Sequence, residues 1–254
     1  MTTSTNTAAT PSSSCGHSRV KASIKYHAVA ILLALRAFSA SAQRRITADV
    51  EVKQVADGKV ITINKRVHCA NNGLVVTHFL KPEEYIVQTN SKGEMKMFMP
   101  KTNEVLLENA TGLSSQDELI SIFMSGRADD MGLAAYGYKL QSTVREEGYI
   151  KKTFTTTNKQ ESPTVEIVYE NFVPIYCGYI NDGGRTVRKV YLSKYALEGR
   201  LMLPTRMTEI NYVSAKDSTV SRIVYSNFQI DKDDPMFEFE VPSNAKVITL
   251  QEAR

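Results

Sequence analysis

From Gln43 onward, apolar and polar residues alternate along the chain with a period of two, which is typical of half-buried β-strands. In the segment ITADVEV, for example, every second residue from Ile46 is apolar. Turn signals such as Asp57-Gly58 separate the alternating segments. The pattern predicts strands over Ile46–Val52, Lys59–Cys69, Leu74–Leu80, Tyr85–Gln88, Glu94–Met99, Tyr138–Val144, Tyr149–Thr157, Thr164–Tyr169, Arg185–Tyr195, Leu201–Val213, Thr219–Ile230 and Met236–Val241.

The strand pattern is interrupted once, over Ser114–Ser125, where the spacing of apolar residues predicts a helix. Ser115 and Glu118 have the spacing of a capping box at its start, and Gly126 is a suitable residue to end it. The predicted helix has one apolar stripe, which consists of Leu119, Ile122 and Phe123.

A sheet of ten or more strands must curl, split or close. We therefore predict a mainly β fold, a single curled antiparallel sheet resembling an unclosed β-barrel, with the one helix as a lid. Such a container is suited to binding. The stripe of Leu119, Ile122 and Phe123 could cover an apolar cavity, or it could simply be the way in which this helix is buried.

Three methionines, Met95, Met97 and Met99, alternate with other residues in one predicted strand, so they point to the same side. Methionine is flexible and polarizable, and a row of it adapts to irregular apolar ligands. Ordinary core packing explains the same pattern. In a container the two interpretations overlap, because the inner face of the sheet is also its core.

The first part of the chain has the features of a secretory signal peptide. Lys21 and Lys25 precede an apolar run, AVAILLALRAFSASA, which ends in small residues at Ala40 and Ala42. The run is shorter than a membrane-spanning helix and contains Arg36. We predict a segment 1–42 that is removed after Ala42 and a mature domain 43–254 that leaves the cytoplasm; a buried helix is the alternative.

The charge distribution supports this division. The chain contains 31 Lys and Arg against 27 Asp and Glu, and residues 1–42 hold four of the basic residues and none of the acidic ones. The remaining domain is therefore balanced in charge. Nucleic-acid binding needs a basic surface, so this class of partner is not expected.

Two cysteines, Cys69 and Cys177, remain after the predicted cleavage, and Cys15 lies before it. A disulfide is permitted outside the cytoplasm, and two buried thiols are equally compatible with the sequence. Neither cysteine follows an apolar leader, so we expect no lipid anchor.

Signals of catalysis are absent from the sequence. His68 and His78 fall in predicted strands, and no metal-binding helix, nucleophile elbow or phosphate-binding glycine loop occurs. The acidic turn at Asp231, Asp233 and Asp234 could hold Ca²⁺, although such turns are usually solvated loops. We expect no enzyme activity, no metal and no cofactor.

Several segments together resemble the LolA/LolB family of lipoprotein carriers. Leu80–Tyr85 resembles the family's strand end, in which a basic residue and a proline precede an aromatic residue. Asn90–Val105 resembles its hairpin with a proline before the second strand. Tyr149–Thr157 and Arg222–Ile230 are similar to its later strands, and Phe237–Ile248 resembles its closing segment.

The resemblance implies an unclosed barrel with a helical lid and an apolar cavity that receives acyl chains of lipoproteins or other lipids. It implies a monomeric carrier in the periplasm that transfers them towards the outer membrane between partner proteins of the two membranes. Met95, Met97, Met99, Leu119, Ile122 and Phe123 would bind the lipid. The family's carrier has an arginine before the proline, which holds the lid; here the residue is Lys81, which lacks the planar fork of arginine.

The alternative function is a regulator of the same fold that senses lipid or peptide and reports envelope stress. A hydrolase with a site that the sequence does not reveal is a third hypothesis.

Overall fold

The computed structural model describes residues 44–56, 58–109, 115, 118–158, 162–214 and 217–249, all in the second of two units, Gln43–Arg254. The predicted export segment, its cleavage position after Ala42 and Cys15 lie outside the described residues. Among the residues that are described, no helix has the length and apolar character needed to cross a membrane.

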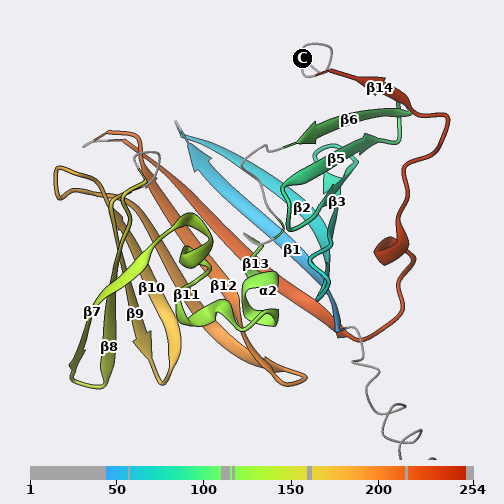
Figure 1. The fold of residues 1–254 in the computed structure, drawn as a ribbon. Coiled ribbons are helices and arrows are strands. Elements are labelled where there is room, and N and C mark those ends of the chain that lie inside the picture. Colours follow the sequence, from blue (N-terminus) through green and yellow to red (C-terminus); the bar gives the residue numbers. More distant parts are fainter. Residues whose placement is uncertain are drawn as a thin grey trace, which may run out of the picture. The chain divides into compact units, whose positions relative to one another are not determined.

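The described chain is built on one large sheet (Figure 1). Its strands are β1 (Arg45–Ala56), β2 (Lys59–Ala70), β3 (Val75–Lys81), β4 (Tyr85–Thr89), β5 (Glu94–Met99), β6 (Glu104–Asn109), β7 (Lys139–Glu146), β8 (Tyr149–Thr155), β9 (Thr164–Glu170), β10 (Val173–Ile180), β11 (Thr186–Glu198), β12 (Leu201–Tyr212), β13 (Ser218–Ile230) and β14 (Lys246–Ile248).

The strands follow the order β14-β6-β5-β4-β3-β2-β1-β13-β12-β11-β10-β9-β8-β7. β1 is paired with β13 on one side and β2 on the other, so the first and the last long strands meet in the middle of the sheet. β14 and β7 form its two edges and do not pair with each other, so the sheet is unclosed. The structure confirms the predicted fold class, a mainly β fold with one curled sheet and a small helical part.

The helical part lies between β6 and β7 and contains α2 (Leu119–Met124), η2 (Arg127–Asp129) and η3 (Leu133–Tyr136). Gly126 ends α2 as predicted and adopts a φ of 71°, which glycine reaches without a steric penalty. The predicted capping box is wrong. Ser115 Oγ donates instead to the carbonyl of Gly73, 2.6 Å away, and the side chain of Glu118 makes no capping hydrogen bond.

The largest hydrophobic core joins this helical part to one face of the sheet, which we call the inner face. Leu119, Ile120, Ile122 and Phe123 of α2 pack there with buried residues of the sheet that include Ile46, Ala48, Val67, Ile167, Leu192 and Leu203. Alternation along the strands places these apolar side chains inward. The helix is short, so its stability comes from this packing rather than from its own hydrogen bonds.

A second core lies at the β3–β6 end of the sheet. Val76, Ile86, Phe98 and Val105 pack against the chain after β13, including Met236, Phe239 and Val241. The strand that we expected over Met236–Val241 is wrong: Pro235–Glu238 forms the short 3₁₀ helix η4, and the final strand is β14. β14 pairs with β6 in parallel, so the sheet is not antiparallel throughout as expected.

Candidate functional site

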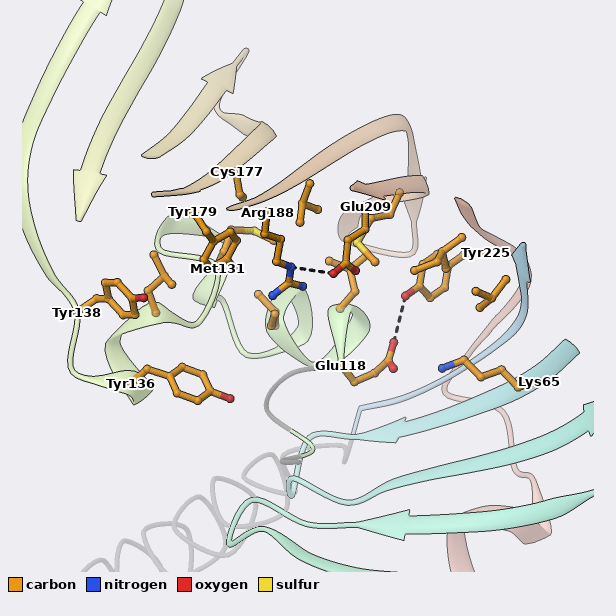
Figure 2. Close-up of a pocket in the computed structure, with 17 residues that line it drawn as sticks. Lys65, Glu118, Met131, Tyr136, Tyr138, Cys177, Tyr179, Arg188, Glu209 and Tyr225 are labelled. Carbon is orange, nitrogen blue, oxygen red and sulfur yellow. Dashed lines mark hydrogen bonds and ion pairs between the residues drawn. The ribbon is translucent and has the colours of Figure 1, made fainter. Parts of the chain in front are cut away.

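A cavity of about 480 Å³ lies between the helical part and the inner face of the sheet (Figure 2). It lies within the size range of sites for small molecules. Each of four neighbouring strands contributes two side chains to it, because residues i and i+2 of a strand point to the same face. These pairs are Cys177 and Tyr179 of β10, Arg188 and Val190 of β11, Met207 and Glu209 of β12, and Ile223 and Tyr225 of β13.

The remaining walls come from two places. Val52 of β1 and Lys65 of β2 extend the sheet side of the cavity. The helical part contributes Glu118, Leu119, Ile122, Met131, Leu133, Tyr136 and Tyr138. The segment that the sequence predicted as a lid therefore forms the opposite wall.

The helical part is fixed to the inner face by contacts at several points. Tyr225 Oη donates to Glu118 Oε1 over 3.3 Å, directly before α2. Lys152 and Tyr169, from β8 and β9, both bind Asp129 of η2. These contacts join the helical part to the sheet at two separate places, Glu118 and Asp129.

The cavity contains two kinds of surface. Aliphatic and thioether side chains form one part, namely Val52, Leu119, Ile122, Met131, Leu133, Val190, Met207 and Ile223. The other part carries four charged side chains, Lys65, Glu118, Arg188 and Glu209, and four tyrosines. The resemblance led us to expect an apolar cavity, and the observed cavity is amphipathic.

Arg188 and Glu209 form an ion pair in this polar part, with 2.8 Å between Nε and Oε1 (Figure 2). The guanidinium also lies over the ring of Tyr179, 4.8 Å from its centroid. Glu209 Oε1 accepts a second contact from Asn211 Nδ2 at 2.9 Å. The acidic partner is thus held in place from two sides.

Burial controls the ionisation of the neighbouring groups. It raises the pKa of the Cys177 thiol to about 12, with Arg188 acting in the opposite direction. It also raises the pKa of Tyr179 and of Tyr225. These three groups are therefore uncharged at neutral pH, and a protonated thiol is a poor nucleophile.

Of the predicted binding residues, Leu119 and Ile122 line the cavity. Phe123 does not; it is buried in the core, and its ring centroid lies 6.3 Å from that of Tyr195. The helical stripe therefore divides between the cavity wall and ordinary packing.

The methionines Met95, Met97 and Met99 do not line this cavity. Met97 pairs with Val87 of β4, which pairs with Thr77 of β3. Thr77 pairs with Val67 of β2, and Val67 pairs with Ala48 of β1, so all five side chains lie on the same face of the sheet. The three methionines therefore lie on the inner face of the sheet. Their strand, β5, is separated by β4 and β3 from β2, which contributes Lys65 to the cavity. Met95 is buried, and the other two are half-buried.

Lys81 is exposed at the end of β3, where it pairs with Asn64, and it does not line the cavity. Its lid contact stays a prediction. The cation that β2 does bring to the cavity is Lys65.

The acidic turn after β13 is used in internal contacts. Asp231 accepts a hydrogen bond from the backbone of Arg45, and Asp233 lies 3.6 Å from the guanidinium of the same residue. Asp234 contacts buried His68 at 3.1 Å and accepts from the backbone of Met236. In the part of the chain that the structure describes, no group of three potential ligands could hold a metal ion. Cys69 and Cys177 are both buried and free.

Sequence reasoning missed the charged pair of the cavity, although a signal for it existed. Arg188 lies on the same face of β11 as the buried residues Val190 and Leu192. Glu209 lies on the same face of β12 as Met207. A charged residue in register with the apolar face of a strand is unusual, because burial of an unpaired charge is costly.

Comparisons with known proteins place this architecture. No family model matches the chain, and no curated protein does. Among solved structures, a DUF1329 family protein from Desulfovibrio piger is 16% identical, with a TM-score of 0.56 over 83% of this chain and 96% of that one.

Two further structures are similar to the chain. A LolA superfamily protein from Nitrosomonas europaea is 15% identical, with a TM-score of 0.55 over 77% of this chain and 90% of that chain. A putative outer membrane lipoprotein-sorting protein domain from Vibrio parahaemolyticus is 12% identical, with a TM-score of 0.53 over 83% of this chain and 96% of that chain. This protein therefore has a divergent LolA-like fold.

Proposed function

We propose that this protein is a periplasmic carrier that holds an acyl chain in the cavity beneath its helical part and transfers it towards the outer membrane. The observation that supports the proposal most directly is the apolar wall formed by Leu119, Ile122, Met207 and Ile223. Burying an alkyl chain there gains about 0.8 kcal/mol for each methylene group removed from water. The predicted export segment and the LolA-like fold agree with this function.

The chemistry of the cavity favours binding over catalysis. Among the described residues that line it, Cys177 is the one thiol, and burial raises the pKa of this thiol to about 12. Tyr225 is uncharged and donates to Glu118. The groups present can hold a ligand by hydrogen bonds and charge, and we assign no group a catalytic role.

The proposal is tested by filling the cavity. Ile223→Trp places a large ring among the lining residues, and it should abolish binding of a fluorescent fatty-acid probe without lowering the free energy of unfolding. Arg222→Trp is the matched control, because Arg222 is the exposed neighbour on the other face of β13. Probe binding that survives in the folded Ile223→Trp variant would contradict the proposal.

We propose in addition that Met95, Met97 and Met99 extend the apolar surface at the β5 end of the inner face. Met97→Ser tests this extension, since Met97 is half-buried and its replacement removes apolar area without adding charge. Weaker binding of a long-chain probe, with unchanged binding of a short-chain probe, is the expected result. Equal affinities for both probes would limit the site to the cavity.

A further inference from the structure

The charges of the cavity are balanced within it. Arg188 and Lys65 supply two positive charges, and Glu118 and Glu209 supply two negative ones. The balance is local at Arg188, whose Nε lies 2.8 Å from Glu209 Oε1. The described lining of the cavity therefore offers both signs of charge side by side, and its four charges sum to zero.

The ion pair between Arg188 and Glu209 leaves one hydrogen-bonding group of Arg188 unsatisfied, its Nε. Despite the short distance, Arg188 Nε is buried and donates no hydrogen bond to any described residue. Its side chain is 42% exposed, and Figure 2 shows the guanidinium directed into the cavity. Because an arginine has five donors in a planar fork, this one retains the capacity to bind an acidic group.

The neighbouring carboxylate limits which ligand can use that capacity. An anionic head group that approaches Arg188 also approaches Glu209 and is repelled by it. A cationic head group that approaches Glu209 is repelled by Arg188 in the same way. A head group with both charges can pair its acidic part with Arg188 and its cationic part with a carboxylate of the cavity.

The size of the cavity limits the apolar part of the ligand. At about 480 Å³ it lies in the lower half of the range for small-molecule sites, about 300–1,000 Å³. The apolar side chains that line it come from the helical part and from strands β1, β11, β12 and β13. This volume suits one acyl chain rather than the several chains of a lipidated protein.

From the charge pattern and the volume together, we propose that the cavity binds a single-chain amphipath with a zwitterionic head group. The chain lies against Ile122, Met207 and Ile223, and the acidic part of the head group takes the donors of Arg188. The cationic part pairs with Glu209 or Glu118. This inference rests on the proposed function and specifies the class of lipid that the carrier accepts.

Four ligands with a twelve-carbon chain test the head group, each used below its micelle concentration. They are dodecylphosphocholine, laurate, dodecyltrimethylammonium and dodecyl maltoside, which are zwitterionic, anionic, cationic and uncharged. We expect dodecylphosphocholine to bind about tenfold more tightly than each of the other three, because it alone satisfies both charges. Isothermal titration calorimetry on the full chain measures the four affinities.

Charge-removing variants show whether the pair sets this preference. Glu209→Gln retains the amide contact with Asn211 and should shift the preference towards laurate. Arg188→Gln should shift it towards dodecyltrimethylammonium. Lys189→Gln is the matched control, because Lys189 is half-buried on the other face of β11, where its ammonium group lies over Tyr212. A structural role alone would change all four affinities by a similar factor.

The outcomes separate this inference from the proposed function. If all four ligands bind with affinities within about twofold, or if another head group binds most tightly, the head-group assignment is overturned while the acyl-carrier function stands. If the folded protein binds none of the four, both proposals fail. A shift of preference in opposite directions for the two variants supports the inference.

Discussion

The hydroxyl group of Tyr225 donates a hydrogen bond to the carboxylate of Glu118, with 3.3 Å between the two oxygens. Tyr225 belongs to β13 and Glu118 immediately precedes α2, so this contact joins the two walls of the cavity. Burial raises the pKa of Tyr225, and the nearby carboxylate raises it further. The phenol therefore keeps its proton and remains a donor.

Removing this donor should loosen the helical part. Tyr225→Phe deletes the hydroxyl group alone, and we expect it to lower the free energy of unfolding by about 1 kcal/mol. It should also release a bound fluorescent acyl probe several-fold faster, which stopped-flow mixing with lipid vesicles measures. Tyr149→Phe, at an exposed tyrosine of β8, is the control.

A double-mutant cycle with Glu118→Gln isolates the contact. The double variant should be no less stable than the worse of the two single variants, since both remove the same interaction. Fully additive losses would show that the two residues act through other neighbours.

Lys81 offers a contrasting test of lid gating, because its role comes from the resemblance alone. Arginine would add planar, forked donors, so Lys81→Arg is expected to slow cargo exchange. Lys81→Leu is expected to favour the open form and to impair release or uptake of the cargo. Exchange rates of the probe in both variants decide the matter. Rates equal to those of the unmodified protein would identify Lys81 as a solvated turn residue.

His68 makes the stability of the domain depend on pH. It is 1% exposed, and burial lowers its pKa, with Asp234 and the Val76 carbonyl opposing the shift. A lowered pKa means that the unfolded chain binds more protons below about pH 6.5. Stability is therefore full above this pH and decreases as the pH falls below it.

Asp234 acts in the same direction at lower pH. Its pKa is lowered even though burial, the largest single influence, raises it; the backbone amide of Met236 and His68 outweigh that effect. Its contribution to stability is present near neutral pH and is lost as the pH falls below about 4.

Urea unfolding between pH 7.5 and pH 5.5 measures the effect of His68. His68→Gln keeps a donor for Asp234 but cannot titrate, so stability should vary less steeply with pH in this variant. Equal slopes in His68→Gln and the unmodified protein would show that the acid sensitivity arises elsewhere.

The two cysteines should behave as inert thiols. Both are buried and free, and burial raises the pKa of Cys177 to about 12 and that of Cys69 well above its usual value. In the Cys15→Ser variant, a disulfide reagent at pH 8 should therefore react slowly with the folded protein. It should modify two thiols after unfolding; fewer than two would indicate a disulfide.

The sequence allowed the strands to be predicted wherever alternation and turn residues agreed. Each predicted strand range other than Met236–Val241 overlaps an observed strand. In that exception the apolar positions are real: Phe237 packs against His68 and Phe239 against Phe98. Their segment is not a strand of the sheet, but burial of residues two apart gives the same alternating sequence pattern as a strand.

The cavity could not be predicted, because it depends on register across several strands. Tyr179 pairs with Arg188, and the register shifts by one residue immediately afterwards, between Tyr179 and Ile180. A shift of one residue reverses the face that a side chain occupies. Local spacing also failed at Ser115 and Glu118, since their partners, Gly73 and Tyr225, are distant in sequence.

Strand β10 was missed because its turn carries an unusual residue. Asn171 and Phe172 form the two-residue connection from β9 to β10, and both have positive φ, 49° and 67°. Glycine normally occupies the second position of such a turn. Pro174 within β10 obscured the strand further, because proline is rare inside sheets.

The same turn gives the last prediction, since Phe172 combines a left-handed backbone with a side chain that is 90% exposed. A residue with a Cβ atom pays about 1–2 kcal/mol for this conformation, and an exposed ring recovers little by burial. Phe172→Gly should therefore raise the free energy of unfolding by about 1 kcal/mol, as measured in urea, and leave probe affinity unchanged. Phe172→Ala keeps the strained Cβ and removes the ring, so its stability should match the unmodified protein. A loss of stability in both variants would show that the ring stabilises the folded domain, and the strain argument would then fail.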